Sequence, residues 1–219
     1  MTGPAENEEI VEPFLEFLID KQGPVLRGPD ASTAKIEAWR GKMPELILTW
    51  WQEVGFAGFA EGLIWLTDPD EWTDIAADFI PICQVLSPAL EPVAHNGPYY
   101  PWLRTAFGEM FCWSPVHGAA IRIDPITRLI SGRDYARDVA DGQPDNGLEA
   151  IIVSDRSRFD TIDEHEKPLF RRLLKRLGPV ASDTMYALTP AAAVVGGPVI
   201  ESNFSIEPAE AQLAVLASL

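Results

Sequence analysis

The sequence predicts an α+β fold, with mixed helices packed on an antiparallel sheet. Segments with helical periodicity and segments with strand character are segregated along the chain instead of alternating regularly. The stretches "AAIRI" and "RLISG" flank "DPIT", a good turn sequence, and this predicts an antiparallel hairpin over residues 119–132. A hydrophobic content of 47% in 219 residues is enough for a sizeable core, as one large domain or two small ones.

The first third of the chain predicts two helices separated by a connector. Residues 11–23, "VEPFLEFLIDKQG", have an apolar side and end at a Gly-Pro pair. Residues 23–35, rich in Gly and Pro, predict the connector. Residues 43–55, "MPELILTWWQEVG", predict a helix with Pro44 at its first position and Gly55 at its end.

The segment "EGLIWLTDPDEW" predicts a short strand and then the start of a helix. Asp68 can cap that helix, Pro69 suits its first position, and Glu71 follows three residues after the cap. Pro81 is expected to end or kink it. A calcium loop is disfavoured because no Gly stands at its sixth position and no Glu at its twelfth.

The rest of the chain predicts strands, then a polar segment, then helices. "FGEMFCW" predicts a strand, "DYARDVADGQPDNG" an exposed loop or broken helix, and "LEAIIVSD" either a strand or a helix. "HEKPLFRRLLKRLG" predicts an amphipathic helix. Gly196-Gly197 predicts a turn, and residues 208–219 a closing amphipathic helix.

The charge is strongly acidic and unevenly placed. The formal net charge is −16, of which residues 1–100 contribute −12 and residues 101–219 contribute −4. Direct binding to nucleic acid or to an anionic membrane is disfavoured, because both need cationic side chains. A basic protein partner is compatible with this charge, and so is an acidic surface that only maintains solubility. No signal peptide or membrane-spanning run is seen, so we expect a soluble, cytoplasmic protein.

No motif predicts catalysis, a cofactor or a metal. The two cysteines form no CxxC pair, and His95, His117 and His165 have no metal-ligand spacing. An enzyme with an unrecognised carboxylate site stays an alternative, and it would use Asp68, Asp70 and Glu71 or Asp138, Asp141 and Asp145. Trp50, Trp51, Trp65 and Trp72 are expected in the core. One of the adjacent Trp50 and Trp51 must point away from the centre of the buried stripe, and an exposed Trp would be a candidate anchor for a partner.

Three stretches resemble a known family. "MPELILTWWQEVGFAGFAEGLIWLTDPDEW" resembles the GAD-like domain of bacterial immunity proteins, and "TAFGEMFCW" matches a strand of the same family. "PLFRRLLKRLGPVASDTMYALTPAAAVVGGPVIESNFSI" and the helix after it are similar to the C-terminal immunity domain of that family. The sequence departs from the pattern in "YALTPAAAVV", where Ala187 replaces a Gly and an expected Phe and Leu are missing.

The resemblance implies an immunity protein of type VI secretion DNase effectors. Such a protein and its toxin are similar to a toxin–antitoxin pair. Such a protein binds the cognate basic DNase toxin and blocks its access to DNA without itself being an enzyme. The alternative is a non-inhibitory adaptor or regulatory module. The resemblance implies a GAD-like domain at residues 1–100 and a C-terminal immunity domain at 101–219, as closely packed subdomains.

A partner-binding surface is expected to consist of exposed acids, because the partner is basic. The candidates lie at the predicted helix start, in the polar segment and before the leucine-rich helix. They are Asp70, Glu71, Asp138, Asp141, Asp145, Asp160, Asp163 and Glu164.

Overall fold

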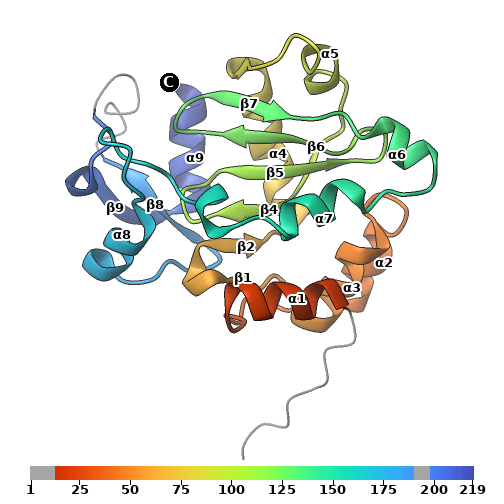
Figure 1. The fold of residues 1–219 in the computed structure, drawn as a ribbon, viewed down its shortest axis with the longest axis horizontal. Coiled ribbons are helices and arrows are strands. Elements are labelled where there is room, and N and C mark those ends of the chain that lie inside the picture. The colour runs from red at the N-terminus through yellow and green to blue at the C-terminus, as the bar shows by residue number, and fades with distance from the viewer. Residues whose placement is uncertain (1–12, 190–197) are drawn as a thin grey trace, which may run out of the picture.

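A seven-stranded sheet organises the molecule, as the computed structural model of residues 13–189 and 198–219 shows (Figure 1). Its strand order is β1-β2-β4-β5-β6-β7-β3, and every pairing is antiparallel except that of β3 with β7. A separate two-stranded sheet pairs β8 with β9. The α+β prediction is therefore confirmed. The strands are β1 (Gly58–Phe59), β2 (Ile64–Leu66), β3 (Gln84–Val85), β4 (Tyr100–Thr105), β5 (Met110–Ser114), β6 (Gly118–Asp124), β7 (Leu129–Gly132), β8 (Thr184–Leu188) and β9 (Phe204–Pro208).

Helices cover both faces of the large sheet. In Figure 1, α7 crosses in front of the sheet, α4 and α9 lie behind it, and α1 to α3 gather at its β1 edge. The helices are α1 (Pro13–Gln22), α2 (Thr33–Trp39), α3 (Glu45–Val54), α4 (Pro69–Phe79), α5 (Glu91–Ala94), α6 (Ala136–Ala140), α7 (Asn146–Ile152), α8 (Phe170–Leu177) and α9 (Ala209–Ser218). Short 3-10 turns occupy Ala60–Gly62, Ile80–Ile82, Arg156–Arg158 and Glu201–Asn203. No helix within the described ranges is long and apolar enough to cross a membrane.

The sheet separates two apolar clusters, because successive side chains of a strand point to opposite faces. On β5, Phe111 and Trp113 belong to the cluster that α1, α3 and α7 complete, while Met110 and Cys112 belong to the cluster that α4 and α9 complete. Both clusters contain side chains from before and after residue 100. The sheet likewise joins β1 and β2 to β4, so both halves of the chain build it, and the domain boundary at residue 100 stays a prediction.

Most local predictions agree with the structure. The hairpin of β6 and β7 is confirmed, and its turn is held by Asp124 Oδ1, which accepts the N–H groups of Ile126 and Thr127 at 2.9 and 3.2 Å. α3 ends at Gly55, whose φ of 64° is left-handed, as expected of a glycine at that position. "LEAIIVSD", which periodicity left open, belongs largely to helix α7. The turn expected at Gly196-Gly197 lies outside the described residues.

One expectation is wrong. The connector over residues 23–35 is not entirely irregular, because α2 begins at Thr33 behind Ser32, whose hydroxyl accepts the Lys35 N–H at 3.2 Å. The expectation that Trp50 and Trp51 lie in the core is confirmed, since their exposed fractions are 0% and 1%. The reason is that α3 is covered on two sides: Trp50 packs near Trp102 of β4, and Trp51 packs edge-on against Phe56, just beyond the helix.

Candidate functional site

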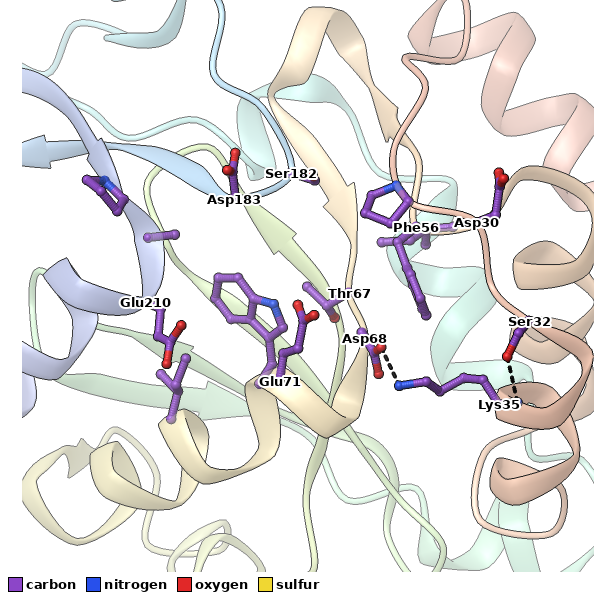
Figure 2. A pocket seen from close by; sticks show the side chains of 16 residues that line it. Asp30, Ser32, Lys35, Phe56, Thr67, Asp68, Glu71, Ser182, Asp183 and Glu210 are labelled. Atoms are coloured by element: carbon purple, nitrogen blue, oxygen red, sulfur yellow. Dashed lines mark hydrogen bonds and ion pairs between the residues drawn. The ribbon is translucent and has the colours of Figure 1, made fainter.

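A pocket of about 540 Å³ lies where α2, α4, the start of α9 and the turn before β8 meet (Figure 2). Its walls combine apolar side chains, Trp72 among them, with a set of charged ones. Five carboxylates against the single ammonium of Lys35 give this lining a formal charge of −4. We call it the acidic pocket; its carboxylates belong to Asp30, Asp68, Glu71, Asp183 and Glu210.

The start of α4 supplies one wall of the acidic pocket. Asp68 caps the helix by accepting the Asp70 N–H at 3.0 Å, and Pro69 occupies the first position, as the sequence predicts. This arrangement leaves Asp70 and Glu71 in the first turn, where a negative charge is favourable to the helix dipole. Helix capping therefore accounts for Asp68, while the side chain of Glu71 stays directed at the pocket that it lines.

Lys35 of α2 neutralises part of this acidic cluster. Its Nζ lies 2.5 Å from Asp68 Oδ2 and 2.6 Å from Asp70 Oδ2, and Trp39 Nε1 donates to Asp70 Oδ1 at 3.1 Å. Burial alone would lower the pKa of Lys35, but the hydrogen bonds to both carboxylates outweigh burial and raise it. Asp68 and Asp70 are thus already satisfied inside the protein.

Three other carboxylates of the acidic pocket have no such partner. Within residues 13–189 and 198–219, no ion pair or side-chain hydrogen bond reaches the carboxylates of Glu71, Asp183 or Glu210. Partial burial raises the pKa of Glu71, and the nearby charge of Asp68 adds to the shift. Figure 2 shows the three side chains projecting from α4, from the turn before β8 and from α9, and all three line the same pocket.

A second hollow of about 360 Å³ adjoins the acidic pocket between α4 and α9, and shares Glu71, Ile75 and Glu210 with it. The outer side of α4 adds Asp74 and Asp78 to its lining, and no Lys or Arg lines it. We call it the α4–α9 hollow. The two hollows together form an acidic face that runs along α4.

Arg104 of β4 holds the wall of the acidic pocket that carries Asp183. The side chain is fully buried, and its Nη2 donates to the carbonyl oxygens of Ala181, Ser182 and Thr184 at 2.8, 2.8 and 3.0 Å. Its guanidinium also lies 5.1 Å from the ring of Trp72. Burial lowers the pKa of Arg104 to about 9. No sequence motif marks this residue.

The structure brings only two of the eight predicted partner-binding residues to this face, Asp70 and Glu71. Asp138, Asp141 and Asp145 lie around α6 and the start of α7; Asp138 accepts Asn146 Nδ2 at 2.7 Å, and Asp141 lies 3.6 Å from Arg137. Asp183 and Glu210 were missed. No local pattern in the sequence marks them, because packing between distant segments brings them to the pocket.

The acids before α8 are built into the fold. Asp160 Oδ1 accepts the N–H groups of Leu169 and Phe170 at 3.2 and 2.9 Å, and so caps α8. Asp163 is 6% exposed, so the expectation that it is a surface charge is wrong. Its carboxylate accepts two backbone N–H groups and lies 2.6 Å from Arg172 Nη2, because the turn before α8 folds over it. Glu164 is exposed.

Two further polar groups lie apart from the acidic face. His117 is buried and packs with Asp134 3.0 Å from its Nδ1 and Asn96 3.1 Å from its Nε2. Glu109 borders a small cavity of about 180 Å³, where burial raises its pKa to about 8 although Arg122 Nε lies 3.0 Å away. Among the described residues, no three His, Cys, Asp or Glu side chains form a group that could hold a metal.

Comparison with known proteins defines the class. The family model of the GAD-like domain matches residues 13–127, more than half of the chain, and the protein belongs to this family. Among solved structures, Atu4351 from Agrobacterium tumefaciens superposes with a TM-score of 0.77 over 94% of this chain and 88% of its own. The sequences are 20% identical, so the likeness establishes a shared fold alone. No curated protein matches the chain.

Proposed function

We propose that this protein is an immunity protein that binds a cognate type VI secretion DNase effector and blocks its access to DNA. The observation that carries the proposal is the acidic pocket, in which five carboxylates face one ammonium. Membership of the GAD-like family and the sequence resemblance to the C-terminal immunity domain support it. The chain acts as a stoichiometric inhibitor in this proposal and not as a catalyst.

The physical basis is competition for a cationic cleft. A nuclease binds DNA through Lys and Arg side chains that replace counterions at the phosphates. A protein of net charge −16 is attracted to the same cleft, and complementary charge speeds association. Glu71, Asp183 and Glu210 are suited to this contact because no basic side chain in the described ranges pairs with them. The inhibitor must act where the chromosome is, so we place it in the cytoplasm.

The test uses the cognate nuclease, found as the product of a neighbouring gene. Plasmid cleavage is measured while the purified immunity protein is titrated in, and we expect cleavage to stop near an equimolar ratio. A nuclease that stays fully active at this ratio contradicts the proposal for that toxin. Recovery of a stable complex with an uninhibited, unrelated protein would favour the alternative of an adaptor.

Charge reversal locates the contact surface. We expect Glu71→Lys with Glu210→Lys to weaken the complex about tenfold or more, because both side chains line the proposed contact. Asp138→Lys with Asp141→Lys makes the same change in the rival patch on α6, and Glu16→Lys with Asp20→Lys makes it on α1. A loss of binding only in the α6 variant would move the contact to that patch.

One observation favours an enzyme as the second candidate. Glu109 combines a raised pKa of about 8 with a position beside a cavity and two arginines, Arg122 and Arg158. Carboxyl groups with such pKa values can act as general acids or bases near neutral pH. Glu109→Gln separates the candidates: an inhibitor keeps its full potency against the nuclease, whereas an acid–base enzyme loses its function.

A further inference from the structure

The unpaired carboxylates of the acidic pocket point to a cationic occupant. Their three charges come from separate elements, yet they line one cavity (Figure 2). Burial is the main cause of the raised pKa of Glu71, and repulsion by the like charges of Asp68 and Glu210 adds to it. The built-in cations relieve this repulsion only in part: Lys35 acts on Glu71 from a distance while it is paired with Asp68 and Asp70, and Arg104 acts on Asp183 while it is bonded to backbone carbonyls.

Trp72 is the second observation. Its side chain lines the acidic pocket and is only 5% exposed, yet Nε1–H donates to no acceptor within the described parts of the chain. This N–H is not among the fully buried polar atoms without a partner, so it is accessible from the pocket, and an indole N–H can only donate. An occupant that brings a carbonyl oxygen as well as a positive charge would satisfy both Trp72 and the carboxylates. A peptide segment has both groups, whereas a free amine has no carbonyl.

The lining favours a guanidinium over an ammonium. A guanidinium is planar and weakly hydrated, bonds carboxylates through several N–H groups and stacks on aromatic rings. The pocket offers three unpaired carboxylates together with Trp72, Phe56 and Ile75, against which an aliphatic stem can pack. Its volume of about 540 Å³ leaves room for the backbone beside such a side chain.

We infer that the acidic pocket receives one arginine side chain of the partner protein, with its guanidinium among Glu71, Asp183 and Glu210 and a flanking carbonyl accepting the Trp72 N–H. The inference rests on the proposed function and adds an anchoring residue to it. Arginine in a desolvated pocket at the centre of an interface is a frequent source of binding energy. Removing this arginine from the toxin would therefore weaken the complex more than removing a peripheral lysine.

The experiment titrates capped tripeptides into the isotopically labelled full-length protein and follows the indole signals by NMR. The probes are acetyl-Gly-Arg-Gly-amide, its neutral citrulline analogue, its lysine analogue and free agmatine. Trp72→Phe assigns the Trp72 signal. We expect the arginine peptide to shift that signal with a dissociation constant of about 1 mM, as befits one anchoring residue. The citrulline peptide should bind about tenfold more weakly, and lysine several-fold more weakly.

Two variants link the signal to the carboxylates. Glu71→Gln with Glu210→Gln should weaken arginine-peptide binding about tenfold, while Glu16→Gln with Asp20→Gln, a matched loss of two charges on α1, should leave it unchanged. Asp183→Asn serves as a second variant if the double variant misfolds. The inference is overturned if citrulline or lysine matches arginine, if the Trp72 signal does not move, or if agmatine binds more tightly than the peptide.

The result of the arginine-peptide titration does not depend on the result of the nuclease inhibition assay. Nuclease inhibition without arginine-peptide binding would refute the anchoring arginine and leave the immunity function standing. Arginine-peptide binding without inhibition of the neighbouring nuclease would refute the immunity function for that toxin and keep the pocket as an arginine site.

Discussion

The acids before α8 and the acids around α4 and α9 have similar composition and opposite roles. Asp160 and Asp163 accept backbone N–H groups, and Asp163 also pairs with Arg172. Glu71, Asp183 and Glu210 have neither kind of partner among the described residues, although they line a cavity. The first group stabilises the fold, and the second leaves negative charge available at the surface.

From this difference we expect the lack of internal partners to be a better guide to a binding face than the exposure of acidic residues. Asp163 and Glu210 both carry a carboxyl group, but only Glu210 can contact another protein without first breaking an ion pair. Substitutions that separate folding from binding test this distinction directly.

The largest effect on stability is expected at Arg104, which supports the pocket wall from inside. Arg104→Met removes the donors to three carbonyl oxygens of residues 181–184 and leaves those acceptors unsatisfied. We expect the free energy of unfolding in urea to fall by about 3 kcal/mol. Arg128→Met, which removes one bond to Leu216 O, is the control and should cost less than about 1 kcal/mol. Equal costs would show that Arg104 does not hold this wall.

The second largest effect on stability is expected at Asp163, and it depends on pH. Bonds from Lys167 N–H, and then from the Arg172 guanidinium, lower the pKa of Asp163 to about 2. Because the folded pKa lies below the ordinary value of 3.8, this stabilisation is present above about pH 4 and disappears as the pH falls toward 2.

Asp163→Asn should therefore lower the melting temperature by several degrees at pH 7, since its amide places a donor against Arg172. The difference in melting temperature between this variant and the unmodified protein should disappear as the pH falls from 4 to 2. Melting curves across this range measure it, and a gap that is constant with pH would disprove the assignment.

A smaller loss of stability is expected when Asp160 is replaced. Asp160→Ala removes the cap of α8 and should lower the free energy of unfolding by about 1 kcal/mol. Glu164→Ala, an exposed neighbour, should change it by less than about 0.5 kcal/mol. Chemical denaturation of both variants gives the comparison, and a larger cost at Glu164 would reverse the roles given to these two acids.

The smallest change in the free energy of unfolding, and the only expected increase, concerns the acidic pocket. Glu71→Gln with Glu210→Gln removes two unpaired charges, so the free energy of unfolding should rise by about 0.5 kcal/mol. The same variant should bind the nuclease more weakly. A loss of stability would mean that these carboxylates support the fold, which would erase the contrast with Asp160 and Asp163.

Local signals in the sequence predict much of the fold. Asp68 with Pro69 marks the start of α4, Gly55 the end of α3, and the turn at Asp124 the hairpin of β6 and β7. These features depend on neighbours in the chain, which is why they can be inferred without coordinates. Trp50 packs near Trp102, and Trp51 packs against Phe56. Helical periodicity does not reveal which side chains make these contacts.

Only part of the candidate site could be predicted from the sequence, because packing between distant segments determines the rest. Asp70 and Glu71 stand out beside the helix start, but Asp183 and Glu210 join them only through the packing of α9 on α4 and the bonding of residues 181–184 to Arg104. Asp163 looks like a surface acid until the turn before α8 closes over it. Long-range contacts decide which of these similar residues are free.

The bonds from Arg104 also bear on how such a chain can diverge. All three acceptors in residues 181–184 are main-chain oxygens, so the contact constrains the path of this turn and not the identity of its side chains. Side chains such as those of Ser182 and Asp183 can therefore change while the scaffold behind them keeps its shape. Under the proposed function, this wall could adapt to a different toxin without a change of fold.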